Sequence, residues 1–416
     1  MDIGLRERIR KRIVDEMDLS MTVDDSEIGA LIDSCILEET KEEYIPIKEK
    51  VQLRTELFNS YRRLDVLTEL LEDDEVTEIM VNGTSPIYVE KKGRIIKTDK
   101  AIPTEEKLHS LIQQIVSDCN RRVNEGSPIV DARLKSGSRV SIVISPVSLN
   151  GTTITIRRFS KNFMGIDRLI ELGAFDESFA KIMKALVRAK YNIFISGGTG
   201  SGKTTFLNAL SAYIPPDERV ITIEDSAELN LKQVENLVRL EARNANVEGE
   251  NSVSIRDLIK ASLRMRPDRI IVGEVRDEAA IDMLQAMNTG HDGSLSTGHA
   301  NSPVDMISRL ETMVLTGVDI PLQAVRRQIS QAVDIIIHLG RMRDKSRKVL
   351  KVSEVLNVEG GEVVLNTLFE FVESSESEGR LVGRLRKVND LANIDKLIRW
   401  NMKELYDEGE REILPL

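Results

Sequence analysis

The chain has 416 residues, of which 41% are hydrophobic and 30% charged, and its formal net charge is −10. This length suffices for two or three domains with a large core. No apolar run approaches the ~20 residues of a membrane span, and the charged N-terminus lacks the apolar segment of a signal peptide. Cys35 and Cys119 provide no disulfide framework and no four-cysteine zinc site, so we expect a reducing, cytoplasmic setting. The acidic balance argues against a dedicated nucleic-acid-binding protein.

Residues 1–75 are predicted to form an N-terminal helical region. Apolar residues recur at helical spacing from Leu5 to Asp18 and again from Val51 to Leu71, within a charged background. The charged run 6–12 is most simply a solvated helix face. Its alternative is a contact with a membrane surface or a partner protein.

Residues 76–160 predict a smaller α+β domain. Turn-forming Asn-Gly and Lys-Gly pairs separate short β-branched runs. The expected strands are 76–81, 86–90, 139–144 and 152–157, and the expected helix is 104–122. Arg139, Arg157 and Arg158 lie in this domain near its junction with the next. Their guanidinium groups could reach a triphosphate across a domain or subunit boundary, as arginine fingers do, or could form ordinary surface ion pairs.

After an expected linker over 161–175, residues 176–372 predict a domain of alternating strands and helices. This alternation is typical of an α/β fold in which helices cover both faces of a mostly parallel sheet. The expected strands are 191–196, 219–224, 269–273, 294–298 and 333–338, followed by a hairpin around Gly360-Gly361. Residues 373–416 are expected to form a helical tail.

An eight-residue run, Gly197-Gly198-Thr199-Gly200-Ser201-Gly202-Lys203-Thr204, fits the phosphate-binding pattern G-x-x-x-x-G-K-S/T. A β-branched run precedes it and a helix-like run follows it, which is the context that this chemistry needs. Glycines let successive N–H groups point at a phosphate, Lys203 would reach the β- and γ-phosphates, and Thr204 would offer its hydroxyl to Mg²⁺. The alternative is a glycine-rich turn that binds nothing. We expect ATP contacts from every residue of this run and from Thr205.

Two acidic segments follow later in the chain. The apolar run from Arg269 ends at Glu274, the form of a Walker B segment, and we expect an adjacent parallel strand to bring Glu274 beside the phosphate loop. There its carboxylate could hold Mg²⁺ directly or through water; otherwise it is a capping residue. Glu224, Asp225 and Glu228 follow another expected strand. One of them could orient or deprotonate the attacking water, and spacing alone does not choose among them.

Two of the four histidines, His291 and His299, flank a short expected strand. Imidazole groups there could sense or stabilise the γ-phosphate. A zinc site is a weak alternative because the spacing fits no standard motif, and ordinary structural histidines are another. The basic run 341–348 is most simply an exposed hairpin loop, with anionic lipid or a membrane protein as its alternative contact.

These motifs, in this order, resemble the secretion-traffic ATPase superfamily of type II secretion, type IV secretion and type IV pili. The runs Leu263–Arg269, Gly137–Val140 and Thr155–Phe159 are most similar to the CpaF/TadA-type ATPases of Flp (tight-adherence) pilus assembly. The resemblance implies a RecA-like ATPase domain preceded by a PAS-like α+β domain. Missing cysteines for a zinc insertion favour the CpaF-like and type IV secretion branches.

The resemblance also implies site residues, partners and location. It assigns Glu228 to water activation and Glu274 to Walker B, places Arg276, His291 and His299 with the catalytic residues, and places Arg139, Arg157 and Arg158 against phosphate. It implies a homohexameric ring at the inner face of the cytoplasmic membrane, whose ATP- and Mg²⁺-dependent domain motion acts on inner-membrane platform proteins. Neither zinc nor dedicated nucleic-acid binding is expected. The alternatives are a RecA-like nucleic-acid translocase or DNA-uptake motor, and a nucleotide-binding regulator without turnover.

Overall fold

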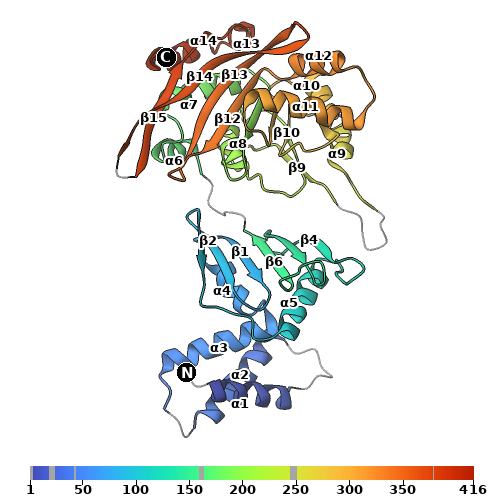
Figure 1. Cartoon of the computed structure of the whole chain (residues 1–416), viewed down its shortest axis with the longest axis vertical. Coiled ribbons are helices and arrows are strands. Elements are labelled where there is room, and N and C mark those ends of the chain that lie inside the picture. Colours follow the sequence, from blue (N-terminus) through green and yellow to red (C-terminus); the bar gives the residue numbers. More distant parts are fainter. Residues whose placement is uncertain (1–2, 18–23, 42–43, 159–163, 244–250, 378) are drawn as a thin grey trace. The chain divides into compact units, whose positions relative to one another are not determined.

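The computed structural model (Figure 1) describes the chain except residues 1–2, 18–23, 42–43, 159–163, 244–250 and 378. The chain divides into two compact units, Met1–Ser160 and Lys161–Leu416. Among the residues described, no helix is both long and apolar enough to span a bilayer.

The first unit begins with helices α1 (Ile3–Glu16), α2 (Asp25–Glu39), α3 (Ile47–Arg62) and α4 (Val66–Glu72). Helices α1 to α3 share a small core of buried aliphatic residues, whereas α4 packs on the sheet that follows. The helical pattern expected from 51 to 71 is therefore interrupted. The break falls at residues 63–65, where Asp65 has a φ of 50° that ends regular helix.

A six-stranded antiparallel sheet forms the rest of the first unit, in the order β3-β2-β1-β6-β5-β4 over the described residues. One face packs against α4 and α5 through alternating residues such as Ile79, Val140 and Ile156. The bounds are β1 (Val76–Asn82), β2 (Ile87–Lys91), β3 (Arg94–Lys97), α5 (Glu105–Asp118), β4 (Ile129–Arg133), β5 (Arg139–Val143) and β6 (Thr153–Arg157). Strands β3 and β4 were not predicted.

A nine-stranded sheet, counted over the described residues, forms the second unit in the order β15-β14-β13-β12-β7-β11-β10-β8-β9. Strands from β12 to β9 in this order run parallel, and β13 to β15 extend the sheet antiparallel. Its strands are β7 (Ile193–Gly197), β8 (Val220–Glu224), β9 (Leu237–Glu241), β10 (Arg269–Val272), β11 (Leu295–Gly298), β12 (Ile335–Arg341), β13 (Arg347–Glu359), β14 (Glu362–Ser377) and β15 (Arg380–Lys387).

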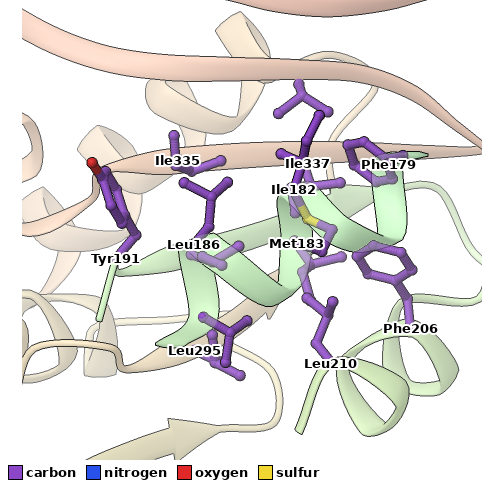
Figure 2. Packing of buried hydrophobic residues seen from close by; sticks show 14 of the residues in the cluster. Phe179, Ile182, Met183, Leu186, Tyr191, Phe206, Leu210, Leu295, Ile335 and Ile337 are labelled. Atoms are coloured by element: carbon purple, nitrogen blue, oxygen red, sulfur yellow. The ribbon is translucent and has the colours of Figure 1, made fainter. Parts of the chain in front are cut away.

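Helices cover both faces of this sheet, as the α/β pattern predicts. Their bounds are α6 (Ile166–Glu171), α7 (Glu177–Arg188), α8 (Lys203–Ser211), α9 (Ile255–Ser262), α10 (Ala279–Asn288), α11 (Pro303–Gly317), α12 (Leu322–Ala332), α13 (Asp395–Arg399) and α14 (Lys403–Glu412). Figure 2 shows α7 residues packed between α8 and the strand residues Ile335 and Ile337. Helices α9 to α12 cover the opposite face with a separate core. The two cores hold the strand ends in place.

Residues 373–387 depart from the expected helical tail. They complete β14 and form β15, and helix appears only in α13 and α14. Leu381 and Leu385 are both buried, and their spacing of four fits a helix as well as a strand. Gly383 lies between them, and because it has no side chain, its position does not show whether the segment follows the helical or the strand pattern. A Cβ at Gly383 would lie 2.5 Å from the carbonyl oxygen of Val372, so the close strand pairing itself requires glycine. The expected linker over 161–175 contains α6.

Candidate nucleotide site

The phosphate loop lies between β7 and α8, at the carboxyl edge of the parallel strands. Gly202 has a φ of 94°, a conformation that glycine adopts without the cost borne by other residues. Gly197 has a φ of 155°, and a Cβ there would lie 2.4 Å from the carbonyl oxygen of Leu339 on β12. Steric and torsional demands therefore account for two of the glycines in the run.

Lys203 is the first residue of α8 and is 7% exposed. Its ammonium donates to the carbonyl oxygens of Gly197 (3.1 Å) and Gly198 (3.0 Å). The cation is thus held over the loop by neutral acceptors. A phosphate oxygen would give the same ammonium a charged partner in a poorly solvated place, where such interactions are strong.

Glu274 follows β10, but β10 is not next to β7 as expected, because β11 lies between them. The residue after β11, His299, fills this interval. One ring nitrogen, Nε2, lies 3.1 Å from the Glu274 Oε1 atom, and the Lys203 ammonium lies 3.4 Å from the ring nitrogens. Lys203, His299 and Glu274 therefore form one continuous set at the sheet edge.

The surroundings of this set shift the pKa values of Glu274 and His299. Burial acts to raise the pKa of Glu274, but the hydrogen bond from Arg276 (2.8 Å) and the positive charges of Arg276 and Lys203 lower it overall. Burial and the nearby Lys203 charge lower the pKa of His299. At neutral pH the site therefore holds an ionised carboxylate and a neutral imidazole. Arg276, expected among the catalytic residues, lies beside Glu274.

The acidic box after β8 separates into two roles. Glu224 is buried, and its carboxylate accepts the backbone N–H groups of Glu228 (2.6 Å) and Leu229 (2.7 Å). Burial raises the pKa of Glu224 to about 7. A Cβ on the neighbouring Gly273 would lie 2.9 Å from the Glu224 Cγ atom, which explains the glycine before Glu274. Glu224 thus shapes the loop, while the Glu228 side chain is half-buried.

The structure does not bring His291 to this edge. His291 precedes β11, its Nδ1 atom lies 3.1 Å from the carbonyl oxygen of Ala286 at the end of α10, and β11 runs from there toward His299. The strand alone spans roughly 13 Å. A catalytic contribution of His291 stays a prediction that the fold of this unit does not support.

The three predicted arginines of the first unit fall on different sides of its sheet. Arg139 lies opposite Arg157 in the β5–β6 register, so both share the face turned away from the core. Arg133 on β4 lies opposite Arg139 and extends the same row. Arg158 instead donates to the carbonyl oxygens of Asp73 and Val76 within its own unit. Its guanidinium is therefore occupied by a structural role in this conformation, and its contact with phosphate stays a prediction.

Comparison with known proteins identifies the family of this chain. A family model described as "Type II/IV secretion system protein" matches residues 62–410. A putative conjugal transfer protein of Mycobacterium tuberculosis is 34% identical over 315 residues, covering 74% of this chain and 88% of that protein. Conjugal transfer protein TrbB of Rhizobium radiobacter is 33% identical over 299 residues, covering 71% and 88%. The crystal structure of the pilus retraction motor PilT with bound ADP, at 22% identity, has a TM-score of 0.51 and covers 83% of this chain and 88% of that one.

The fold and the site define a P-loop ATPase with a RecA-like arrangement of parallel strands. The chain belongs to the type II/IV secretion system protein family, which is a family of ATPases. The PilT likeness supports the fold. The predicted fold class and enzyme class are thereby confirmed, and the superfamily resemblance is confirmed at the level of this family.

Proposed function

We propose that this chain is the ATP-hydrolysing motor of a pilus-assembly or secretion apparatus, working as a homohexameric ring at the inner face of the cytoplasmic membrane. The observation that carries the proposal is the Lys203–His299–Glu274 set at the edge of the parallel sheet. This set links a phosphate-binding cation to an ionised acid through a neutral imidazole. Hydrolysis of a triphosphate bound at Lys203 would therefore change the electrostatic surroundings of the residues that follow β10 and β11.

ATP is the substrate of this site. Lys203 would leave the carbonyl oxygens of Gly197 and Gly198 for the β- and γ-phosphates, while the remaining loop N–H groups bind the β-phosphate. The Thr204 hydroxyl and the Glu274 carboxylate are oxygen donors of the kind that Mg²⁺ prefers, and the lowered pKa of Glu274 keeps its carboxylate ionised. These residues would hold Mg²⁺, which supplies charge neutralisation on the phosphates.

Glu228 is proposed to orient and deprotonate the attacking water. The structure supports Glu228 over Glu224, because the Glu224 carboxylate is buried and occupied by two backbone N–H groups, one of them that of Glu228 itself. Glu224 then acts as a positioning residue for Glu228. We further propose that Arg139 and Arg157, on one face of the first unit's sheet, contact the triphosphate and convert its hydrolysis into domain motion.

The proposed partners are inner-membrane proteins of a pilus or secretion apparatus. The CpaF/TadA-like motifs favour assembly of Flp-type pili, with inner-membrane platform proteins receiving the motion. Two relatives carry names from conjugal transfer. The alternative to a pilus is therefore a conjugation-type secretion apparatus, which the same ATPase activity would drive. In both cases the motor acts on the apparatus and not on nucleic acid directly.

An ATPase assay with matched variants tests the proposal. Lys203→Ala should abolish turnover with the fold retained, and Glu228→Gln should bind ATP but hydrolyse it at least ~100-fold more slowly, the lower end of the general-base range. Glu235→Gln, an exposed glutamate outside the site, serves as the control and should match the wild type. Undiminished turnover in Lys203→Ala would refute the assignment. Salt-sensitive stimulation of turnover by DNA would favour a nucleic-acid motor instead.

Mass measurement in the presence of ATP tests the ring. A particle of six chains supports the proposed hexamer, and a monomer at all nucleotide concentrations contradicts it. Lys203→Ala should lose any nucleotide-dependent assembly together with turnover, which separates a nucleotide-driven ring from one that forms by itself.

A further inference from the structure

The β12–β13 hairpin carries two arginines directly beside the phosphate loop. Arg341 and Arg347 lie opposite each other at the end of the hairpin, and the turn between them is closed by a hydrogen bond from the Met342 N–H to the Ser346 carbonyl oxygen (2.8 Å). These residues belong to the basic run that the sequence suggested was an exposed loop. β12 also lies next to β7 in the sheet, so the hairpin ends where the phosphate loop begins.

Arg347 contacts the loop itself. Its Nε atom donates to the Gly200 carbonyl oxygen at 2.8 Å. A Cβ on Gly202 would lie 3.1 Å from the Arg347 Cδ atom, and a Cβ on Gly200 would lie 3.8 Å from an Arg341 guanidinium nitrogen. The arginine side chain therefore passes over the backbone from Gly200 to Gly202, in the middle of the run that receives phosphate.

This hydrogen bond fixes the direction of a peptide group. In a trans peptide the carbonyl and the following N–H point in opposite directions. Because Arg347 holds the Gly200 carbonyl, the Ser201 N–H is turned to the other side, where it makes a long bond of 3.3 Å to the Gly198 carbonyl oxygen. A phosphate oxygen is a stronger acceptor for this N–H than that carbonyl. Arg347 thus presets a donor of the phosphate-binding loop.

Contacts with neighbouring segments hold the hairpin that carries Arg347 in place. The Asp344 carboxylate accepts hydrogen bonds from the Ser346 N–H (2.9 Å) and from the Leu381 N–H of β15 (2.8 Å). On the other side, the Val349 N–H donates to the Ala174 carbonyl oxygen (3.0 Å). Support of this kind is what holds a functional group in one geometry.

We propose that Arg347 is a positioning residue for nucleotide binding, which holds the Gly200–Ser201 peptide so that the loop is ready to receive phosphate before ATP arrives. The inference rests on the proposed ATPase function of this loop and concerns how the loop keeps its shape. Since the loop cradles the phosphate common to ATP and ADP, Arg347 serves both nucleotides equally.

The test compares Arg347→Ala, Arg347→Lys and the control Arg343→Ala in the full-length chain. Arg343 lies in the same turn and is equally basic, but its contacts are with Glu373 and Glu376. Dissociation constants for fluorescent ATP and ADP analogues, together with KM and kcat, are the measurements. Losing a charge-assisted hydrogen bond predicts about tenfold weaker binding of both nucleotides by Arg347→Ala, with KM raised more than kcat is lowered. Arg347→Lys should recover part of the affinity, because an ammonium can still donate to the carbonyl.

Three results would overturn the inference. The first is Arg347→Ala with wild-type affinity for both nucleotides. The second is an equal loss in Arg343→Ala, which would mean that only the charge or fold of the turn matters. The third is a loss confined to ATP, which would place Arg347 on the γ-phosphate and not on the loop. Wild-type turnover and its loss in Lys203→Ala are measured alongside. If the wild type itself neither binds nor hydrolyses ATP, the proposed function fails; if it does both, a failure belongs to Arg347 alone.

Discussion

Replacing Glu224 with glutamine should remove a specific pH dependence from the stability of the second unit. Burial raises the pKa of this carboxyl from an ordinary 4.5 to about 7. The folded state then holds a proton that the unfolded state has already released, so Glu224 costs stability as the pH rises from about 4.5 to 7. Above pH 7 both states are ionised and the cost is constant. For that shift the difference in unfolding free energy between Glu224→Gln and the wild type should grow by about 2–3 kcal/mol from pH 5 to pH 8, in favour of the variant.

Glutamine suits this substitution because its side-chain oxygen can still accept the backbone N–H of Glu228 or Leu229. Urea unfolding followed by the fluorescence of Trp400 is the assay, since Trp400 is the only tryptophan in the sequence and lies in the same unit as Glu224. Asp344→Asn is the control of opposite sign. Hydrogen bonds from Ser346 and Leu381 overcome burial and lower the pKa of Asp344 to about 2, so its stabilisation is lost only as the pH falls from about 4 toward 2.

A free-energy difference between Glu224→Gln and the wild type that stays flat from pH 5 to pH 8 would refute this reasoning. It would mean that Glu224 ionises normally in the folded protein and that the two N–H groups compensate fully for its burial. A difference that shrinks with rising pH would go further and show that the folded site prefers the carboxylate.

Three further changes test the packing around the site, each by urea unfolding followed at Trp400. Gly273→Ala should cost about 1–3 kcal/mol and slow ATP turnover, because the new methyl group would lie 2.9 Å from the Glu224 Cγ atom; unchanged turnover would contradict this. Glu218→Ala should cost about 3–5 kcal/mol, since it removes the carboxylate partner of the fully buried Arg269; a cost below about 1 kcal/mol would contradict it. Phe179→Ala should cost about 3–5 kcal/mol, because its ring is buried against Phe175 and Phe369; a near-neutral result would show that the core collapses around the gap.

Local patterns predicted the phosphate loop, the Walker B acid and the α/β class, because each depends on residues close together in the chain. The order of the strands in the sheet could not be predicted from such local patterns. Nothing near Glu274 indicates that β11 separates β10 from β7, and this insertion is what gives His299 its place between Lys203 and Glu274. The contact of Arg347 with Gly200 joins residues 147 positions apart and leaves no local signal. Proximity in sequence and the family resemblance both predict His291 beside His299, but β11 separates the two residues.

The packing of α14 on α7 has a consequence for how the protein reaches its fold. Gly409 sits so close to α7 that a Cβ there would lie 2.5 Å from the Ser178 carbonyl oxygen, and Ser178 bonds to Glu412, 234 positions later. Contacts of such sequence separation form late. At ordinary rates of synthesis, roughly 10–50 s pass between the synthesis of α7 and the synthesis of α14, which covers its apolar surface. During that interval the nascent chain exposes the α7 surface around Ile182, which Gly409 of α14 covers in the folded protein.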